Sequence, residues 1–465
     1  MIAGPDSRYN PSVSIFKAYD IRGVVPDQLR AEDAYRIGRA VARFLSASEL
    51  VIGRDARSSS PALAEALVRG VTEEGTGVVD IGLVATPMLY FAVDRLEAGG
   101  GIMVTASHNP PEYNGFKICR EHAIPIGEAS GLQEIEHHYA EIGPAAAARQ
   151  GGDASPPGVR RVDVVSEYVD HALSVGGGRS SFRVAIDCGN GMASVGLSPL
   201  LGRLDLEVER LYFEPDCTFP NHPADPLKVE NLADLREAVR RSGADFGVAF
   251  DGDADRAIFV DECGEPVPCD LMTGLLARSQ LRRHPGGRVL FDLRSSWATR
   301  EEIEDAGGIA EICRVGHSFV KASMRESGAI FAGELSGHFY FRFSPTLVAD
   351  DGIAAFVALL DVLSDAGRPL SELVAPLRRY AASGEISRRV SDPRAVIASV
   401  EAEHSGAPEI SRMDGLLVRY PNWWFNLRPS NTEPLLRLNV EARSAEVMAR
   451  ERDRLLARME GAKSP

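Results

Sequence analysis

The sequence predicts an α/β protein with three tandem doubly wound α/β domains containing mixed sheets, followed by a C-terminal α+β domain. Its 465 residues provide room for three or four domains of ~100–150 residues each. Short apolar strands alternate with amphipathic helices in three successive series up to about residue 380. Beyond about Ser383 this alternation gives way to a helix, three strands and a final helix, which predicts a smaller α+β unit.

The first series follows the segment 16–23. Its expected helices carry an apolar stripe at helical spacing, and its expected strands are short apolar runs. The expected elements are, in order, a helix at 31–45, a strand at 51–55, a helix capped by Ser60 and begun by Pro61, a strand at 78–81, a helix opened by Thr86 and Pro87, and a strand at 101–104.

The same order recurs twice, which predicts three copies of one folding unit. The recurring strands are expected at 184–187, 206–213 and 245–250, and then at 289–292, 309–314 and 329–332. Each copy opens with a strand closed by an aspartate, namely Asp55, Asp187 or Asp292. Each copy ends in a polar loop, with the sequences TASHNP at 105–110, DGDADR at 251–256 and GELSGH at 333–338. Because ligands bind at the carboxyl ends of strands in open α/β sheets, we expect these loops to form a site.

The C-terminal unit is expected to contain a helix at 394–404, strands at 416–420, 423–428 and 435–442, and a helix at 445–459. A Pro/Gly-rich stretch at 143–158 indicates a linker or long loop between the first two units. The expected domains are therefore 1–155, 156–264, 265–380 and 381–465.

Composition limits the partners. A net charge of −15 argues against a nucleic acid or an anionic membrane as partner, whereas a local cluster of basic residues can still bind a small phosphorylated molecule. The six cysteines are scattered without CxxC or zinc spacing, which favours free thiols. No signal-peptide segment and no apolar run of membrane-spanning length occurs, so we expect a cytoplasmic protein.

The loop after the strand at 101–104 places a hydroxyl, Ser107, next to an imidazole, His108, and Pro110 fixes its exit. Taken alone, these residues also describe an ordinary turn. The segment Asn114–Lys117 follows closely, and a turn would return Lys117 towards Ser107.

Three carboxylates, Asp251, Asp253 and Asp255, follow a buried strand at alternate positions. In an extended backbone they would project to one side, where hard oxygen ligands suit Mg²⁺ or Ca²⁺. An EF-hand is excluded because its sixth position is Arg256 instead of glycine and because both flanks resemble strands. We expect Mg²⁺, because magnesium sites also use phosphate oxygens.

Other polar groups fall in loops that the repeat model directs into one cleft. Glu334 and Ser336, two residues apart, could bind neighbouring sugar hydroxyls. The hydroxyl and amide groups of the turn after Arg428 could cradle a phosphate. The remaining basic candidates are Arg22, Lys117, Arg256, Arg294 and His317.

Four motifs in one order, TASHNP, DGDADR, GELSGH and RPSNTEP, resemble the α-D-phosphohexomutase family and, within it, its phosphomannomutase/phosphoglucomutase branch. The likeness extends from KAYDIRG at 17–23 to the last strands. The resemblance implies a heart-shaped, four-domain enzyme with one motif from each domain around a deep cleft. It implies interconversion of hexose 1-phosphate and 6-phosphate through a phosphoserine and a hexose 1,6-bisphosphate, which also serves as activator.

The resemblance also assigns roles to residues. Ser107 would carry the phosphate, and one of its oxygens would join Asp251, Asp253 and Asp255 around Mg²⁺. Glu334 and Ser336 would bind the sugar, and either Lys117 or His317 would move the hydroxyl proton. The phosphate that does not react would be held by Arg428, Ser430, Asn431 and Thr432. The other residues expected to line the site are Tyr19, Arg22, His108, Arg256, Arg294 and His338.

Two sequence departures and two rival functions accompany this prediction. Arg294 stands where similar bacterial enzymes commonly have lysine. Because arginine does not give up its proton near neutral pH, this disfavours an acid/base role there but not contact with a phosphate or hydroxyl. Ala106 replaces a frequent glycine. Phosphoglucosamine mutase is disfavoured because Leu335 occupies a place where that branch usually has glutamine. The other rival is a non-catalytic sugar-phosphate sensor. The expected partners are small sugar phosphates, the expected oligomeric state is monomer or dimer, and the C-terminal domain is an expected mobile lid.

Overall fold

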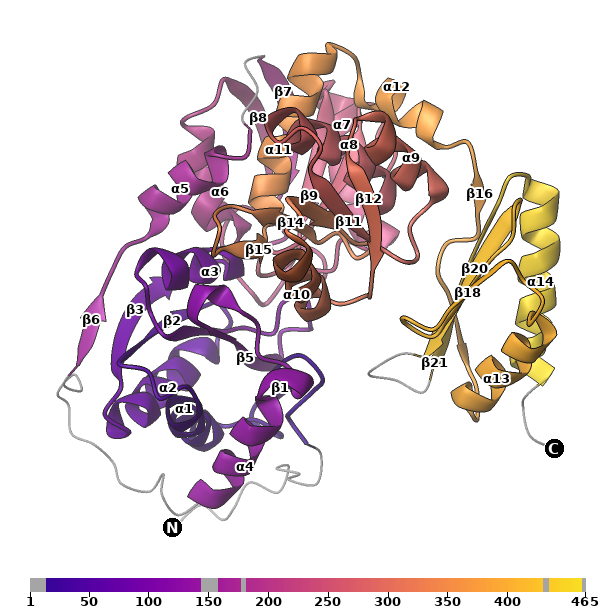
Figure 1. Ribbon diagram of the computed structural model, residues 1–465. Helices are drawn as coiled ribbons and strands as arrows, with labels where there is room; N and C mark the ends of the chain where they lie inside the picture. The colour runs from indigo at the N-terminus through magenta and orange to yellow at the C-terminus, as the bar shows by residue number, and fades with distance from the viewer. Residues whose placement is uncertain (1–13, 144–157, 177–180, 430–434, 462–465) are drawn as a thin grey trace. The chain divides into compact units, whose positions relative to one another are not determined.

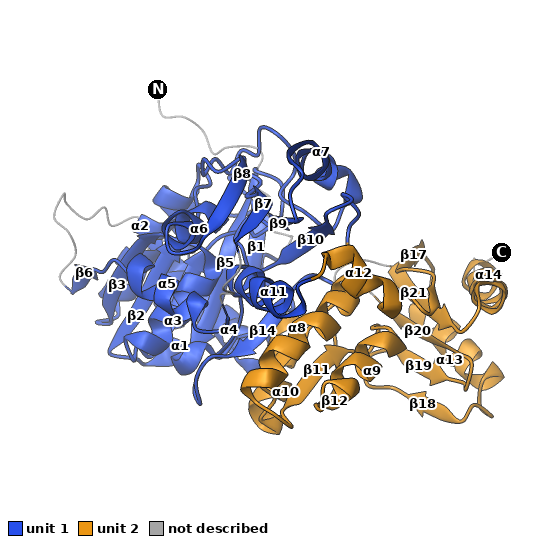
Figure 2. Ribbon diagram, turned by 90° about the horizontal axis from the view of Figure 1, so that it is seen from above, with its two compact units in different colours: residues 1–266, 336–367 blue, residues 267–335, 368–465 orange. Residues whose placement is uncertain are grey.

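A computed structural model describes residues 14–143, 158–176, 181–429 and 435–461 (Figure 1). The chain divides into two units, the first formed by residues 1–266 and 336–367 and the second by residues 267–335 and 368–465 (Figure 2). Each unit is described by itself.

The first unit begins with a six-stranded mixed sheet of order β1-β5-β4-β2-β3-β6. Its strands are β1 (Ile21–Val24), β2 (Glu49–Arg54), β3 (Gly77–Leu83), β4 (Gly100–Val104), β5 (Tyr113–Arg120) and β6 (Val159–Arg161). Its helices are α1 (Ala31–Leu45), α2 (Ser60–Glu73), α3 (Thr86–Arg95) and α4 (Leu132–Ile142). β2, β3 and β4 run parallel, and β5 returns antiparallel to β4 with Lys117 opposite Met103.

A second sheet in the same unit has the order β10-β9-β7-β8. Its strands are β7 (Phe182–Asp187), β8 (Leu206–Leu211), β9 (Phe246–Phe250) and β10 (Ala257–Asp261), and the helices are α5 (Val165–Leu173), α6 (Ala193–Leu201) and α7 (Ala233–Ser242). The hairpin of β14 (Phe339–Arg342) and β15 (Val348–Asp350) leads into α11 (Gly352–Ala366), which is buried over most of its length.

The second unit contains the third copy and the C-terminal sheet. β11 (Arg288–Asp292) pairs in parallel with β12 (Ile309–Cys313) and β13 (Phe331–Gly333). The helices of this copy are α8 (Cys269–Arg283), α9 (Trp297–Asp305), α10 (His317–Ser327) and α12 (Leu370–Val374). In all three copies the first strand therefore lies between the second and the third, which confirms the predicted repeat.

The C-terminal sheet has the order β16-β21-β20-β19-β18, and β17 also pairs with β21. Its strands are β16 (Ala381–Ala382), β17 (Ile386–Arg389), β18 (Glu409–Ser411), β19 (Leu416–Arg419), β20 (Trp423–Pro429) and β21 (Leu435–Ala442). The helices α13 (Pro393–Glu403) and α14 (Ala445–Gly461) contribute to its apolar core. The predicted α+β unit is therefore present, whereas the domain bounds given above stay a prediction.

The aspartates that close the first strands share one backbone arrangement. One carboxylate oxygen of each accepts a hydrogen bond from the backbone N–H two residues later, which fixes the turn at the carboxyl end of the strand. The pairs are Arg57 N to Asp55 (3.0 Å), Gly189 N to Asp187 (2.8 Å) and Arg294 N to Asp292 (2.8 Å).

One predicted helix start was wrong by one residue. α2 begins at Ser60, and Ser59 occupies the N-cap position. The hydroxyl of Ser60 instead donates a hydrogen bond to Oδ1 of Asp55 at 2.5 Å.

Candidate active site

The TASHNP loop begins where the fully buried strand β4 ends, at Val104. Ser107 has a φ of 51°, which places its backbone in the left-handed region that a serine rarely adopts. Its N–H donates to Oγ1 of Thr105 at 3.0 Å, and its side chain lies 3.1 Å from Nδ1 of His108. Ser107 is only 3% exposed, so the loop holds its hydroxyl inside the protein.

The DGDADR loop turns instead of continuing as the extended segment predicted above. Ala254 has a φ of 64°, and its N–H donates to the carbonyl of Asp251 at 3.1 Å. This turn, and not strand alternation, brings Asp251, Asp253 and Asp255 together, with one oxygen of each within 4.8 Å of the others. All three aspartates are buried, so they form a compact acidic trio.

These two loops meet within the first unit. Oγ of Ser107 donates a hydrogen bond of 2.9 Å to Oδ2 of Asp251. The backbones also approach closely, because a Cβ added to Gly252 would lie 2.4 Å from the carbonyl oxygen of Ser107. The structure therefore brings the predicted phosphate-carrying serine and the predicted metal ligands into direct contact.

Lys117 reaches this trio from β5. Its Nζ lies 2.6 Å from Oδ2 of Asp253 and 2.5 Å from Oδ2 of Asp255. Burial by itself would lower the pKa of Lys117, but the neighbouring carboxylates raise it overall and keep the ammonium charged. The return of Lys117 towards Ser107 thus follows from the antiparallel register of β4 and β5.

The carboxylates differ in their electrostatic surroundings. Burial, reinforced by repulsion from Asp255 and Asp253, raises the pKa of Asp251 well above its usual value. Burial also opposes ionisation of Asp255, but Lys117 and then His338 outweigh it and lower the pKa of Asp255. Repulsion among buried carboxylates is relieved when a cation binds between them.

The trio fits a divalent cation. Oδ2 of Asp253 accepts hydrogen bonds from Thr86 Oγ1 and Lys117 Nζ, both at 2.6 Å. Its Oδ1 is buried and has no hydrogen-bond partner among the described residues. A buried carboxylate oxygen left without a donor, beside two further carboxylates, is an arrangement that a hard cation completes.

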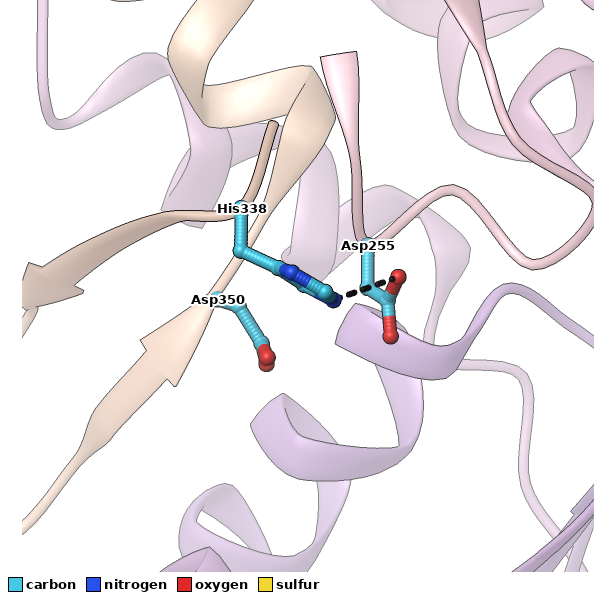
Figure 3. A group of neighbouring side chains, drawn as sticks. All are labelled: Asp255, His338 and Asp350. Atoms are coloured by element: carbon cyan, nitrogen blue, oxygen red, sulfur yellow. Dashed lines mark ion pairs between the residues drawn. The ribbon is translucent and has the colours of Figure 1, made fainter. Parts of the chain in front are cut away.

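A second group of neighbouring ligand atoms, formed by His338, Asp255 and Asp350, shares Asp255 with the trio (Figure 3). The His338 ring extends towards Asp255, and its Nε2 lies 3.4 Å from Oδ1 of that residue. Nε of Arg256 donates to the same nitrogen at 3.3 Å, and Nδ1 lies 2.8 Å from Oγ of Ser336. His338, Arg256 and Ser336 thus form one hydrogen-bonded network at the edge of the trio.

Other predicted residues of the first unit surround the serine loop. Nη1 of Arg22 donates to Oδ1 of Asn109 at 2.7 Å. Burial, and then the charges of Arg256 and Arg22, lowers the pKa of His108 well below its usual value, which favours the neutral imidazole. Tyr19 lies half-buried before β1.

In the second unit, the side chain of Glu334 accepts a hydrogen bond from the backbone at the start of α10. The N–H of Gly316, directly before His317, donates to Oε1 of Glu334 at 2.6 Å. The N–H of Leu335 donates to Oδ2 of Asp292 at 2.8 Å, so the aspartate that closes β11 also fixes the GELSGH loop.

A cluster of arginines around Glu385 lies in the same unit. Arg294 donates through Nη1 to Oε2 of Glu385 at 2.9 Å, and through Nη2 to Asp292 at 2.8 Å. Nη2 of Arg428 lies 3.6 Å from Oε2 of Glu385, and Nη1 of Arg437 donates to Oε1 at 2.8 Å. Three guanidinium groups face two carboxylates, those of Glu385 and Asp292, and this leaves an excess of positive charge, which suits an anion.

The remaining phosphate-binding candidates, Ser430, Asn431 and Thr432, lie outside the described residues. The convergence of the two units' residues on one cleft stays a prediction.

Several residues that contact this site were not predicted. Arg57 contacts the carbonyls of the serine loop, Thr86 contacts Asp253, and Glu385 contacts the predicted arginines. A shared pattern could have indicated Arg57, because aspartate and arginine stand two apart in Asp55–Arg57 as in Asp292–Arg294. No local signal indicates Thr86, which lies 167 residues from Asp253.

Within the described parts of the chain, none of the helices combines the length and the apolar character needed to cross a membrane.

Comparison with protein families gives four consecutive matches. The models are described as phosphoglucomutase/phosphomannomutase alpha/beta/alpha domains I, II and III and the C-terminal domain of the same family. They match residues 13–145, 166–264, 269–380 and 385–458, respectively.

Individual relatives agree. A phosphomannomutase of Salmonella montevideo is 39% identical over 93% of this chain and 95% of its own, and a phosphoglucomutase of Neisseria meningitidis is 40% identical over 93% and 94%. A crystal structure of a phosphoglucomutase/phosphomannomutase family protein from Burkholderia thailandensis superimposes with a TM-score of 0.86 at 33% identity, covering 96% of this chain and 97% of the other. The chain therefore belongs to the phosphoglucomutase/phosphomannomutase family and is an isomerase of the mutase type.

Proposed function

We propose that this mutase interconverts the 1-phosphates and 6-phosphates of glucose and mannose through a phosphoserine at Ser107 and a hexose 1,6-bisphosphate. The observation that carries the proposal is the contact of Ser107 Oγ with Asp251 at the edge of the buried trio. A hydroxyl held beside a cation-binding cluster can accept a phosphoryl group whose charge the cluster's cation offsets.

In the forward reaction, the free C6 hydroxyl of a hexose 1-phosphate attacks the phosphorus of phosphorylated Ser107. The bond from Oγ to phosphorus breaks, the sugar becomes the 1,6-bisphosphate, and the hydroxyl proton passes to a protein base. After the intermediate reorients, Oγ of Ser107 attacks the phosphorus of the C1 phosphate and loses its proton. The bond from the C1 oxygen to phosphorus breaks, this oxygen takes up a proton, and the hexose 6-phosphate leaves. A hexose 1,6-bisphosphate from solution acts as activator because it phosphorylates the free serine.

The metal of this proposal is Mg²⁺, which Asp251, Asp253, Asp255 and an oxygen of the phosphorylated Ser107 would hold. When bound, it would neutralise charge on the transferring phosphoryl group. The candidates to move the proton are Lys117, which lies at the trio, and His317 in the second unit. Because the ammonium of Lys117 stays charged, it would act as the acid that protonates Oγ of Ser107 as the bond to phosphorus breaks. The basic and polar groups proposed to orient the reacting end are Tyr19, Arg22, His108, Arg256 and His338.

The rest of the substrate is assigned to the second unit and the GELSGH loop. Glu334 and Ser336 would bind the 3- and 4-hydroxyls, which glucose and mannose share, because the two sugars differ at C2. Arg294 and Arg428, with Ser430, Asn431 and Thr432, would hold the phosphate that does not react. The names of the relatives, one a phosphomannomutase and one a phosphoglucomutase, support the use of both sugars.

A coupled assay with four substrates tests this function. Glucose, mannose, glucosamine and N-acetylglucosamine 1-phosphates are supplied separately with Mg²⁺ and glucose 1,6-bisphosphate, and kcat/KM is measured for each. We expect glucose and mannose 1-phosphates to differ by less than about tenfold in kcat/KM, because Glu334 and Ser336 would bind the C3 and C4 hydroxyls that both sugars share. Preference for an amino sugar would establish phosphoglucosamine mutase activity instead, and binding without turnover would establish a sensor.

A further inference from the structure

The guanidinium of Arg57 donates hydrogen bonds to backbone carbonyls of the loop that carries Ser107. We propose that Arg57 is a positioning residue for the reaction, which fixes the backbone of the TASHNP loop so that Ser107 Oγ points at the aspartate trio. The inference rests on the proposed function, in which Ser107 is the phosphoryl carrier. It adds a residue that contacts neither substrate nor metal.

The contacts of Arg57 converge on one loop. Nη2 donates to the carbonyls of Ser107 at 2.8 Å and Asn109 at 2.6 Å. Nη1 donates to the carbonyls of Pro110 at 2.6 Å and Tyr113 at 2.9 Å. One planar guanidinium therefore fixes four carbonyls between residues 107 and 113, a task that requires its fork of donors.

These contacts exclude direct substrate binding by Arg57. The two Nη atoms carry four hydrogens, and four carbonyl oxygens accept them. The residue is 1% exposed, and its Nε lies 3.2 Å from Oδ2 of Asp55. Its charge is therefore balanced inside the protein, and its Nη donors are already used by the loop.

The loop needs such support. The left-handed φ of Ser107 is an unfavourable conformation for a residue with a Cβ, and it persists only where the surroundings determine it. Arg57 binds the carbonyl of this same residue, and Thr105 accepts its N–H. Both sides of the unusual backbone are thus held, and the direction of the side chain is set by that backbone.

Comparison with the second copy of the repeat shows that the turn after the closing aspartate does not need the side chain of Arg57. In the second copy the residue two after Asp187 is Gly189, and its N–H makes the same hydrogen bond to the aspartate that the N–H of Arg57 makes to Asp55. The turn therefore forms without an arginine side chain. What the guanidinium of Arg57 adds is the support of the serine loop.

The supporting aspartate is itself held in place. Oδ1 of Asp55 accepts hydrogen bonds from the backbone N–H of Arg57 and from the hydroxyl of Ser60. Asn114, near the start of β5, donates a hydrogen bond of 2.9 Å to that hydroxyl. Asp55 thus links Arg57 to the carboxyl end of β2 and to the first turn of α2.

The test compares Arg57→Lys with Arg36→Lys in the full-length enzyme. Arg36 is a matched control because it is also buried in the first domain, where it donates to the carbonyl of Tyr139 at 2.8 Å and stacks on that ring. Its hydrogen bond and its ion pair are made to Tyr139 and Asp33, both outside the serine loop. For each variant we would measure kcat and KM for glucose 1-phosphate, thermal stability, and the rate of phosphoryl transfer to glucose 6-phosphate in a single turnover.

We expect Arg57→Lys to lower kcat and the single-turnover rate about 100-fold, because an error of ~1 Å in the position of a reacting group has an effect of this size. KM should stay within about threefold, because binding of the sugar phosphate does not involve Arg57. Arg36→Lys should keep kcat within about twofold of the parent, even where it loses as much thermal stability as Arg57→Lys does.

The proposal is overturned if Arg57→Lys keeps kcat within threefold of the parent, or if both lysine variants lose activity in proportion to stability. Should Arg57→Lys fail to fold, Asp55→Asn removes the charge partner and is expected to lower kcat with KM unchanged; an unchanged kcat would then refute the inference. The parent enzyme in the same assays distinguishes failure of this inference from failure of the proposed function. A parent that is inactive and carries no phosphate on Ser107 contradicts the proposed function itself.

Discussion

Oγ of Ser107 donates a 2.9 Å hydrogen bond to Oδ2 of Asp251, a residue 144 positions further along the chain. The contact joins the loop after β4 to the loop after β9, the third strands of the first two copies of the repeat. Equivalent strand ends in two α/β domains thereby supply the two halves of one chemical site.

Gly252→Ala should slow the reaction by moving one of the two loops. The new Cβ would lie 2.4 Å from the carbonyl oxygen of Ser107, so one loop must move. We expect turnover to fall about 100-fold, because displacement of a reacting group by ~1 Å has an effect of this size. Steady-state kinetics measures the loss, and Gly202→Ala is the control because its Cβ would meet nothing closer than 3.4 Å. Equal activity of the two variants would show that the approach of the loops is not required.

Thr86→Val should weaken metal binding. The substitution keeps the shape of the side chain but removes the 2.6 Å hydrogen bond from Oγ1 to Oδ2 of Asp253. Because partners of metal-ligating carboxylates contribute about 10- to 100-fold to affinity, the Mg²⁺ concentration for half-maximal activity should rise by at least about tenfold. Activity measured against Mg²⁺ concentration, after removal of metal by chelation, tests this.

Thr72→Val is the matched control for that experiment, since the Thr72 hydroxyl donates only to the carbonyls of its own helix, those of Val68 and Arg69. An unchanged metal requirement in Thr86→Val would contradict the support that Thr86 gives to Asp253 as a ligand.

Asp351→Asn should change how stability depends on pH. Burial raises the pKa of Asp351 to about 7, while its carboxylate caps α11 through the N–H of Ala354. The folded state therefore binds the proton more tightly than the unfolded state, whose pKa is about 4, and this contribution to stability is lost as pH rises from about 4 to 7. Asparagine keeps the cap without the charge.

Denaturant unfolding of both proteins across that range measures the difference. The free energy of unfolding of Asp351→Asn should rise relative to the parent by up to ~1.4 kcal/mol per pH unit between about pH 4 and pH 7. Parallel pH curves for the two proteins would show that Asp351 does not titrate in the folded state in this range.

Much of the fold could be predicted because strand ends and turn residues are encoded locally. The strands that precede Ser107 and Asp251 lie where their apolar runs predict them, and the repeat of closing aspartates, such as Asp55, was visible in the sequence. The return of Lys117 was also predictable, because a short connection after β4 favours an antiparallel neighbour.

Contacts between distant segments could not be predicted. The DGDADR loop turns at Ala254, whose carbonyl accepts a hydrogen bond at 3.2 Å from Gly352, almost a hundred residues later. Alternation in the sequence identified the three aspartates but gave the wrong geometry, because the supporting segment is not local. Ser60 was mistaken for a cap for a local reason, since its hydroxyl binds Asp55, five residues earlier, instead of the helix terminus.

The central claim is that Ser107 carries the phosphoryl group, and Ser107→Ala removes the only atom that can do so in this account. Turnover should fall by a factor of ~10³ or more, because the covalent step is lost.

The most direct measurement is the intact mass of the protein and of its proteolytic peptides after incubation with Mg²⁺ and glucose 1,6-bisphosphate. The account predicts an increase of about 80 Da on the peptide that contains Ser107, and no increase in Ser107→Ala. A phosphate found on another residue, or normal turnover by Ser107→Ala, would contradict it.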